Sequence, residues 1–177
     1  MTPTPEFDPF ETLGLPRSYA TDAARVRRAW LAASAELHPD RAGADPLGEA
    51  EVARRSAAIN EARRILDDPE LRADTLLRLL GGPPKESDKS LPDGFLMAMM
   101  EVREELESAM GDAGEVAKLE RWAQEQRAGY QDRIAANFRH LQETEDDSAL
   151  VAIRTELNAW RYIERMLEQI HPGAITR

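Results

Sequence analysis

Apolar residues recur along this chain at the three- and four-residue spacing of an α-helix, and the alternation typical of strands is missing. We therefore predict an all-α protein. Proline and glycine mark the helix ends, because proline cannot donate the helical hydrogen bond and glycine readily adopts conformations that stop a helix. The predicted helices cover the approximate ranges 9–13, 22–37, 46–66, 69–80, 94–110, 115–142 and 148–170.

Three of the predicted helix starts share an Asp-Pro pair. The aspartate side chain can accept hydrogen bonds from the first free backbone N–H groups, and proline is tolerated at the first helical position. The pairs are Asp8-Pro9, Asp45-Pro46 and Asp68-Pro69. Pro39 should end the second helix, because the residue before a proline is pushed out of the helical region.

A stretch rich in helix breakers separates the first four predicted helices from the last three. Its sequence, GGPPKESD at 81–88, contains two glycines, two prolines and no large apolar residue, which is typical of a linker. We predict an amino-terminal domain over 1–80, a linker over 81–92 and a carboxy-terminal domain over 93–177. The first domain should hold four helices, including an antiparallel pair, and the second a three-helix bundle.

Composition narrows the possible functions. The chain has 42% hydrophobic and 32% charged residues and no cysteine, so it is expected to have a sizeable core and no disulfide, thiolate or sulfur-rich metal chemistry. Its formal charge of −10 opposes binding to nucleic acid. No apolar run approaches the length of a membrane span, and the first residues lack the pattern of a signal peptide. We expect a cytoplasmic protein with no membrane partner.

The sequence gives no sign of catalysis. Its histidines, His38, His140 and His171, are far apart, and no glycine-rich phosphate loop occurs. We predict that the chain is not an enzyme and assign no catalytic, cofactor-binding or metal-binding residue.

One basic strip stands out in this acidic chain. Arginines in the first half of the second helix are followed, where that helix ends, by a His-Pro-Asp-Arg sequence. A proline-locked turn beside positive charge suits an acidic partner surface, although Asp40 and His38 could instead simply cap and cover the helix end. The residues of the candidate contact are Arg25, Arg27, Arg28, His38, Pro39, Asp40 and Arg41.

The helix predicted over 94–110 has apolar residues on two sides. At 100° per residue, one stripe should face the bundle and consists of Phe95, Met99, Val102, Leu106 and Ala109. Leu96, Met97 and Met100 lie elsewhere, accompanied by Glu101 and Glu104. Periodicity leaves two explanations open: a partner-binding patch of flexible methionines with a carboxylate rim, or a surface covered by the linker or by the other domain.

The last predicted helix shows the same feature more weakly. Its core stripe consists of Ile153, Leu157, Trp160, Ile163 and Leu167. Tyr162 and Met166 should point elsewhere and would extend the patch if the first and third bundle helices are neighbours.

The amino-terminal half resembles a J domain over residues 8–74. The resemblance rests on DPFETLGL at 8–15, VRRAW at 26–30, INEA at 59–62 and the Asp68-Pro69 pair, together with the His-Pro-Asp loop. It implies that the second helix and this loop dock on an Hsp70-type ATPase in its ATP state and stimulate hydrolysis. Where many J domains carry further basic residues, this chain has Leu31, Ala32 and Glu36, which favours a specialised Hsp70 partner.

Nearly the whole chain resembles the HscB family, the J-type co-chaperones of iron-sulfur cluster biogenesis. The segments FLMAMMEVREEL at 95–106 and RADTLLRLLG at 72–81 carry this resemblance. It implies a dedicated, HscA-like Hsp70 and an IscU-like iron-sulfur scaffold as partners, with cluster transfer as the outcome. The scaffold contacts implied by matching motif positions are Leu96, Met97, Met100, Glu101, Glu104 and, by looser alignment, Tyr162.

Two other binding functions stay open at this stage. The bundle could hold a different client for an Hsp70, or the J domain could be degenerate and the chain a scaffold that does not stimulate ATP hydrolysis. Both alternatives keep the same fold and differ only in the partner or in the stimulation of an Hsp70.

Overall fold

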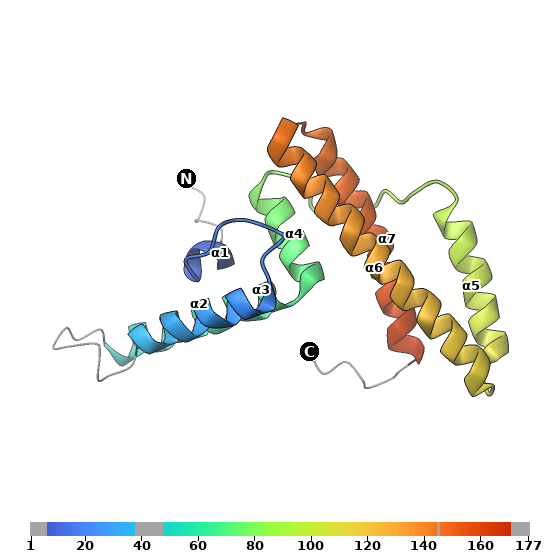
Figure 1. Ribbon diagram of the computed structural model, residues 1–177, viewed down its shortest axis with the longest axis horizontal. Coiled ribbons are helices and arrows are strands. Elements are labelled where there is room, and N and C mark those ends of the chain that lie inside the picture. Colours follow the sequence, from blue (N-terminus) through green and yellow to red (C-terminus); the bar gives the residue numbers. More distant parts are fainter. Residues whose placement is uncertain (1–6, 38–47, 145, 171–177) are drawn as a thin grey trace. The chain divides into compact units, whose positions relative to one another are not determined.

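The computed structural model describes residues 7–37, 48–144 and 146–170 of this 177-residue chain. Within these ranges the regular elements are all α-helices, as predicted (Figure 1). The chain forms two compact units, Met1–Leu79 and Leu80–Arg177. The helices are α1 (Pro9–Thr12), α2 (Ala23–Glu36), α3 (Glu49–Asp67), α4 (Pro69–Leu79), α5 (Phe95–Ala109), α6 (Ala113–Thr144) and α7 (Ser148–Ile170).

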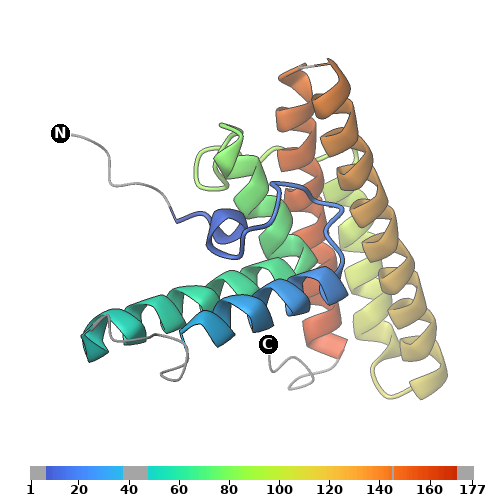
Figure 2. The same ribbon diagram turned by 60° about the vertical axis from the view of Figure 1, so that its left-hand side comes forward.

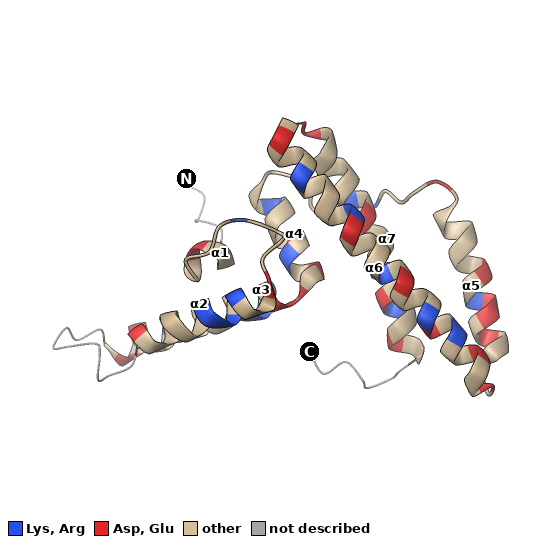
Figure 3. Cartoon of the chain, viewed as in Figure 1, with Lys and Arg blue, Asp and Glu red and all other residues tan. Residues whose placement is uncertain are grey.

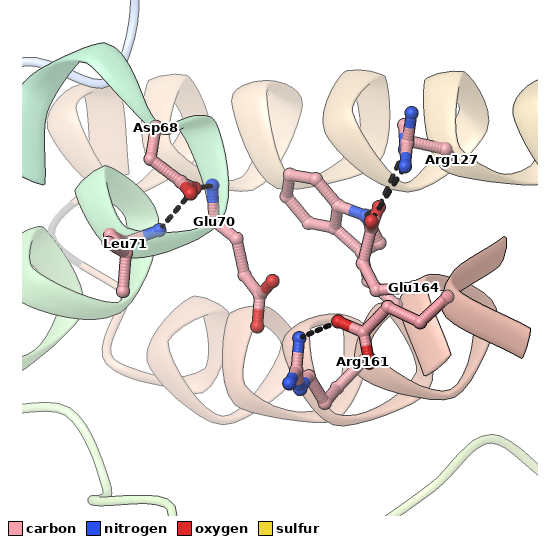
Figure 4. Close-up of polar contacts among 8 residues, drawn as sticks. Asp68, Glu70, Leu71, Arg127, Arg161 and Glu164 are labelled. Atoms are coloured by element: carbon pink, nitrogen blue, oxygen red, sulfur yellow. Dashed lines mark hydrogen bonds and ion pairs between the residues drawn. The ribbon is translucent and has the colours of Figure 1, made fainter. Parts of the chain in front are cut away.

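Aspartate side chains start helices where the Asp-Pro pairs predicted them. The Asp8 carboxylate accepts from the backbone N–H of Phe10 at 2.8 Å. Asp68 does the same for Glu70 at 2.9 Å and Leu71 at 3.1 Å (Figure 4). Each carboxylate thus satisfies backbone donors that have no partner inside the helix, which explains the sharp starts of α1 and α4.

The predicted start of α3 was wrong. The helix begins at Glu49, and its N-cap is Gly48, which contributes no side-chain hydrogen bond. The Asp45-Pro46 pair lies outside the described residues. A local cap signal therefore misplaced this helix start by about one turn, whereas the predicted end near Leu66 agrees with the last residue, Asp67.

The amino-terminal unit is built on the pairing of α2 with α3, which lie side by side in both ribbon views (Figures 1 and 2). The indole Nε1 of Trp30 donates to Asn60 Oδ1 at 3.0 Å, and the Arg63 guanidinium lies 4.2 Å from the centre of the Trp30 ring. These polar contacts fix the register of two helices whose shared core is apolar. The fully or almost fully buried side chains of this unit include Phe10, Val26, Leu66, Leu76 and Leu77.

Arg72 of α4 ties the segment before α2 to the end of α3. Its guanidinium donates to the backbone oxygens of Tyr19 at 3.1 Å and Leu66 at 2.5 Å. Burial lowers the pKa of this guanidinium from its usual value. This half-buried cation satisfies carbonyl oxygens and holds three chain segments together.

In the carboxy-terminal unit, α6 and α7 form a long antiparallel pair, and α5 packs along α6 (Figures 1 and 2). Asp112 caps α6 by accepting from Gly114 N at 2.8 Å, so this helix starts slightly before the predicted Glu115. The core of the unit is apolar and includes Ala123, Ile134, Ile153, Ala159 and Ile163, each at most 1% exposed.

Two charged residues of this unit, Arg154 and Glu164, are buried. The Glu164 side chain is 4% exposed and accepts two hydrogen bonds of 2.6 Å from Arg127, together with one of 2.7 Å from the indole N–H of Trp160 (Figure 4). The paired arginine and the indole replace the water that the carboxylate loses on burial. This network joins the middle of α6 to α7.

Candidate functional site

The basic strip predicted on the second helix lies on the outer face of α2. Val26 is fully buried and turns one side of the helix to the core, which leaves Arg25, Arg27 and Arg28 exposed. Within the described part of the chain, Arg27 and Arg28 form no ion pair. The strip is therefore free to attract an acidic surface (Figure 3). The other predicted residues of this contact, His38, Pro39, Asp40 and Arg41, lie outside the described residues.

The two faces predicted for α5 are confirmed. Leu106 and Ala109 are each 6% exposed, and Phe95, Met99 and Val102 are half-buried, so this stripe faces the bundle. The opposite face carries the large apolar side chains Leu96, Met97 and Met100, which are 54%, 71% and 65% exposed. Glu101 and Glu104 are also exposed and, among the described residues, form no ion pair.

Within the carboxy-terminal unit, the exposed face of α5 remains open to solvent. Neighbouring large apolar side chains that stay in water mark a binding surface more often than isolated ones do. Thioether side chains adapt to irregular partners, and unpaired carboxylates at the edge favour partners with basic residues. We call the face formed by Leu96, Met97, Met100, Glu101 and Glu104 the α5 face.

Tyr162 of α7 contacts the first residue of α5. Its ring is 36% exposed and meets the Phe95 ring edge-on, with 5.5 Å between centroids and an interplanar angle of 79°. This contact places the start of α5 beside α7. Phe95 belongs to the bundle-facing stripe of α5, so the part that Tyr162 plays beside the α5 face stays a prediction.

The exposure predicted for Met166 was wrong. It was expected to point away from the core with Tyr162, but it is only 6% exposed. Besides α6, α7 contacts Phe95 and the segment before α5, so several neighbours bury a wider arc of this helix than one partner would.

Two polar residues of α7 that were not predicted as functional position α5. Arg154 Nε donates to the backbone oxygen of Pro83 at 2.8 Å, and Asn158 Nδ2 donates to the backbone oxygens of Asp88 and Ser90 at 3.0 Å each. The predicted linker is thus held along α7 before the chain turns at Gly94, whose φ of 73° suits glycine. Polar residues within the apolar pattern of α7 were the available signal.

Neither metal chemistry nor a membrane span emerges from the described residues. Across 7–37, 48–144 and 146–170, no three His, Asp or Glu side chains are grouped as metal ligands would be. His140 lies 3.8 Å from Asp146, and His38 and His171 are outside the described ranges. No described helix is long and apolar enough to cross a bilayer.

Comparison with known families assigns both units. Residues 8–75 match the DnaJ domain model, and residues 91–171 match the HSCB C-terminal oligomerisation domain. The chain is also 34% identical over 165 residues to the co-chaperone protein HscB homolog of Bordetella avium (strain 197N), which covers 92% of this chain and 95% of that protein. This chain belongs to the HscB co-chaperone family.

Further HscB relatives agree in sequence and in structure. The HscB homolog of Chromobacterium violaceum is 37% identical over 145 residues, which are 81% of this chain and 76% of that protein. The structure of HscB from Vibrio cholerae superposes with a TM-score of 0.71 at 25% identity, covering 93% and 96% of the two chains. The crystal structure of human HscB gives a TM-score of 0.76 at 23% identity, covering 99% and 86%.

These findings confirm the family and the fold class that the sequence predicted. The chain is an all-α HscB protein with an amino-terminal J domain and a carboxy-terminal HscB domain. Its α5 face belongs to the HscB domain, whereas the basic strip on α2 belongs to the J domain. The roles of the individual site residues stay predictions.

Proposed function

We propose that this protein is a co-chaperone that binds an iron-sulfur scaffold protein and stimulates ATP hydrolysis by a dedicated Hsp70, which promotes cluster transfer. The observation that carries this proposal is the α5 face, an exposed apolar surface with a carboxylate rim in the HscB domain. The J domain supplies the second half of the activity, because J domains act on Hsp70-type ATPases. The protein would work in the cytoplasm and would perform no chemistry of its own.

On the Hsp70 side, the exposed arginines of α2 would steer the J domain toward an acidic surface of the ATPase. Such charges mainly raise the association rate and select the orientation, whereas the His38-Pro39-Asp40 loop would trigger hydrolysis. Leu31 is 50% exposed on the same helix, at a position where a basic residue is common in J domains. This departure supports a dedicated, HscA-like Hsp70 rather than a general one.

On the client side, Leu96, Met97 and Met100 would anchor an IscU-like scaffold. Burial of apolar side chains supplies most of the binding energy at such interfaces, and a few central residues dominate it. Glu101 and Glu104 would favour basic residues at the edge, and Tyr162 would extend the contact onto α7.

A single-turnover experiment tests both halves of this proposal. Hydrolysis of ATP pre-bound to the candidate Hsp70 is followed with the Hsp70 alone, with this protein added, and with this protein and the purified iron-sulfur scaffold added together. We expect stimulation by the protein alone and a further increase with the scaffold, because a bound client is delivered together with the J domain. A rate unaffected by either addition contradicts the proposal, and stimulation without any scaffold effect contradicts the assigned client.

A further inference from the structure

An open groove of about 870 Å³ runs between α5 and α6, beside the α5 face. Its apolar wall is formed by Ala109, Leu119 and Trp122, and its rim on α5 by Glu101, Glu104 and Glu105. Figure 3 shows acidic residues gathered along this part of α5. Glu101 and Glu104 belong to both the groove and the α5 face, so the two features form one continuous surface.

Trp122 differs from the other two tryptophans of the chain. Trp30 donates its indole N–H to Asn60, and Trp160 donates to Glu164. Trp122 is partly exposed and makes no polar contact with any residue in the described ranges. Trp122 lines the groove, and the negative π-face of an indole attracts a cation.

The rim carboxylates are crowded and lack basic partners. Glu101, Glu104 and Glu105 stand at three- and four-residue spacings on one helix, where like charges repel. Within the described residues none of them forms an ion pair. Lys118 of α6 also lines the groove, and it is paired with Glu115 at 2.6 Å rather than with a carboxylate of α5. A cation from a partner would relieve the repulsion on α5.

A lysine or arginine side chain matches this combination of features. Its aliphatic stem can lie against Ala109 and Leu119, while its charged end meets the Trp122 ring and the rim carboxylates. We infer that the α5–α6 groove receives a lysine or arginine side chain of the same scaffold protein that binds the α5 face. This inference rests on the proposed function and adds a second, charge-selective contact to it.

The test uses the full-length protein and the purified iron-sulfur scaffold as the probe. We expect Trp122→Leu to weaken scaffold binding by about fivefold, because the cation loses its aromatic partner. Trp122→Phe keeps an aromatic face and should restore part of the affinity. Glu105→Gln, at an exposed position outside the α5 face, should weaken binding by about threefold. Glu125→Gln, which removes an exposed carboxylate of α6 outside the groove, is the matched control and should bind like the parent.

Indole N–H signals in a nitrogen–proton NMR spectrum supply a direct readout. Trp122→Leu identifies its own signal by removing it. On titration with the scaffold, the Trp122 signal should shift while those of Trp30 and Trp160 stay in place. The inference is wrong if the Trp122 signal does not shift at saturation and if Trp122→Leu and Glu105→Gln bind the scaffold as tightly as the parent does. That result would not affect the role proposed for the α5 face.

Two further outcomes are distinguishable. If the parent protein does not bind the scaffold at all, both the proposed function and the groove inference are wrong. If the Trp122 signal shifts with the concentration of this protein alone, a second copy of the chain occupies the groove, which also overturns the inference. Sedimentation velocity at the same concentrations identifies that case.

Discussion

The outer faces of α2 and α5 are both exposed, but they are exposed in different ways. The α2 face presents arginines on a helix whose position is fixed by Trp30, Asn60 and Arg63. The α5 face presents leucine and methionine side chains at the edge of the bundle. A charged face on a well-anchored helix suits rapid, salt-sensitive docking, whereas an adaptable apolar face suits slower dissociation from a client. The two surfaces of one chain are thus built for different kinds of contact.

The variant that should separate Hsp70 stimulation from scaffold binding most clearly is Asp40→Asn. We expect this change to abolish stimulation of the Hsp70 in single-turnover hydrolysis, because the resemblance to J domains places Asp40 in the triggering loop. Scaffold affinity, measured by calorimetry on the same sample, should equal that of the parent. Stimulation that survives in this variant would refute the role of the loop, whatever happens to the client.

The next largest effect should follow from Arg127→Met in the carboxy-terminal unit. The Glu164 carboxylate would keep the Trp160 N–H but lose two hydrogen bonds from Arg127 in a buried position. We expect the free energy of unfolding to fall by about 3 kcal/mol, the scale for a broken buried ion pair. Hydrogen exchange read by mass spectrometry should quicken in α6 and α7.

Two controls accompany Arg127→Met: hydrogen exchange in the amino-terminal unit, and a variant that breaks a more exposed ion pair. Peptides from α2 and α3 should exchange as in the parent, and Arg133→Met, which breaks the more exposed pair between Arg133 and Glu156, should cost only about 0.5 kcal/mol. Equal losses from both variants would mean that the buried network contributes no more than a surface ion pair.

How far these features could be predicted depends on how local they are. The starts of α1 and α4 were predictable because Asp8 and Asp68 contact N–H groups two and three residues away. The same reasoning failed at α3, whose cap is Gly48 and carries no side chain that could signal it. The exposed α5 face followed from helical periodicity. That rule applies at the edge of a bundle, where only one side of the helix is buried.

Features that depend on contacts among several segments could not be predicted from the sequence. Met166 is buried because α7 is contacted from more than one direction, which periodicity alone does not reveal. Trp122 could be recognised only as a packing residue, since the groove that it lines depends on the spacing of α5 and α6. Arg154 and Asn158 hold carbonyl groups 71, 70 and 68 residues away in sequence, beyond any local pattern.

A truncation of the α5 face tests its apolar half. Leu96→Ala combined with Met100→Ala should weaken scaffold binding by about 1 to 3 kcal/mol, the range for interface anchors. The loss of stability should be small, because both side chains are largely exposed in the parent. Calorimetric binding and thermal unfolding of the same double variant give both values.

Met110→Ala is the matched control for this truncation. Met110 is 70% exposed, close to the 65% of Met100, and follows the last residue of α5 outside the α5 face. It should leave scaffold affinity unchanged. If the double variant unfolds, or if the Met110 control weakens binding equally, the two-face description of α5 is wrong.

The smallest expected effect concerns the charged face. Arg27→Ala combined with Arg28→Ala should lower Hsp70 affinity by about 1 kcal/mol at low salt, since each exposed charge contributes little. Most of this change should appear in the association rate measured by stopped flow. The difference from the parent should shrink as salt rises, because counterions screen exposed charges over about 10 Å at 0.1 M.

The control for this variant is Arg121→Ala with Arg139→Ala, which removes two exposed arginines of α6. It produces the same change in net charge and should leave the association rate unaltered. By contrast, the loss caused by the Leu96 and Met100 truncation should persist at high salt, because apolar burial is not screened. Equal salt dependence of the two losses would mean that both faces bind by charge, and the distinction between α2 and α5 would fail.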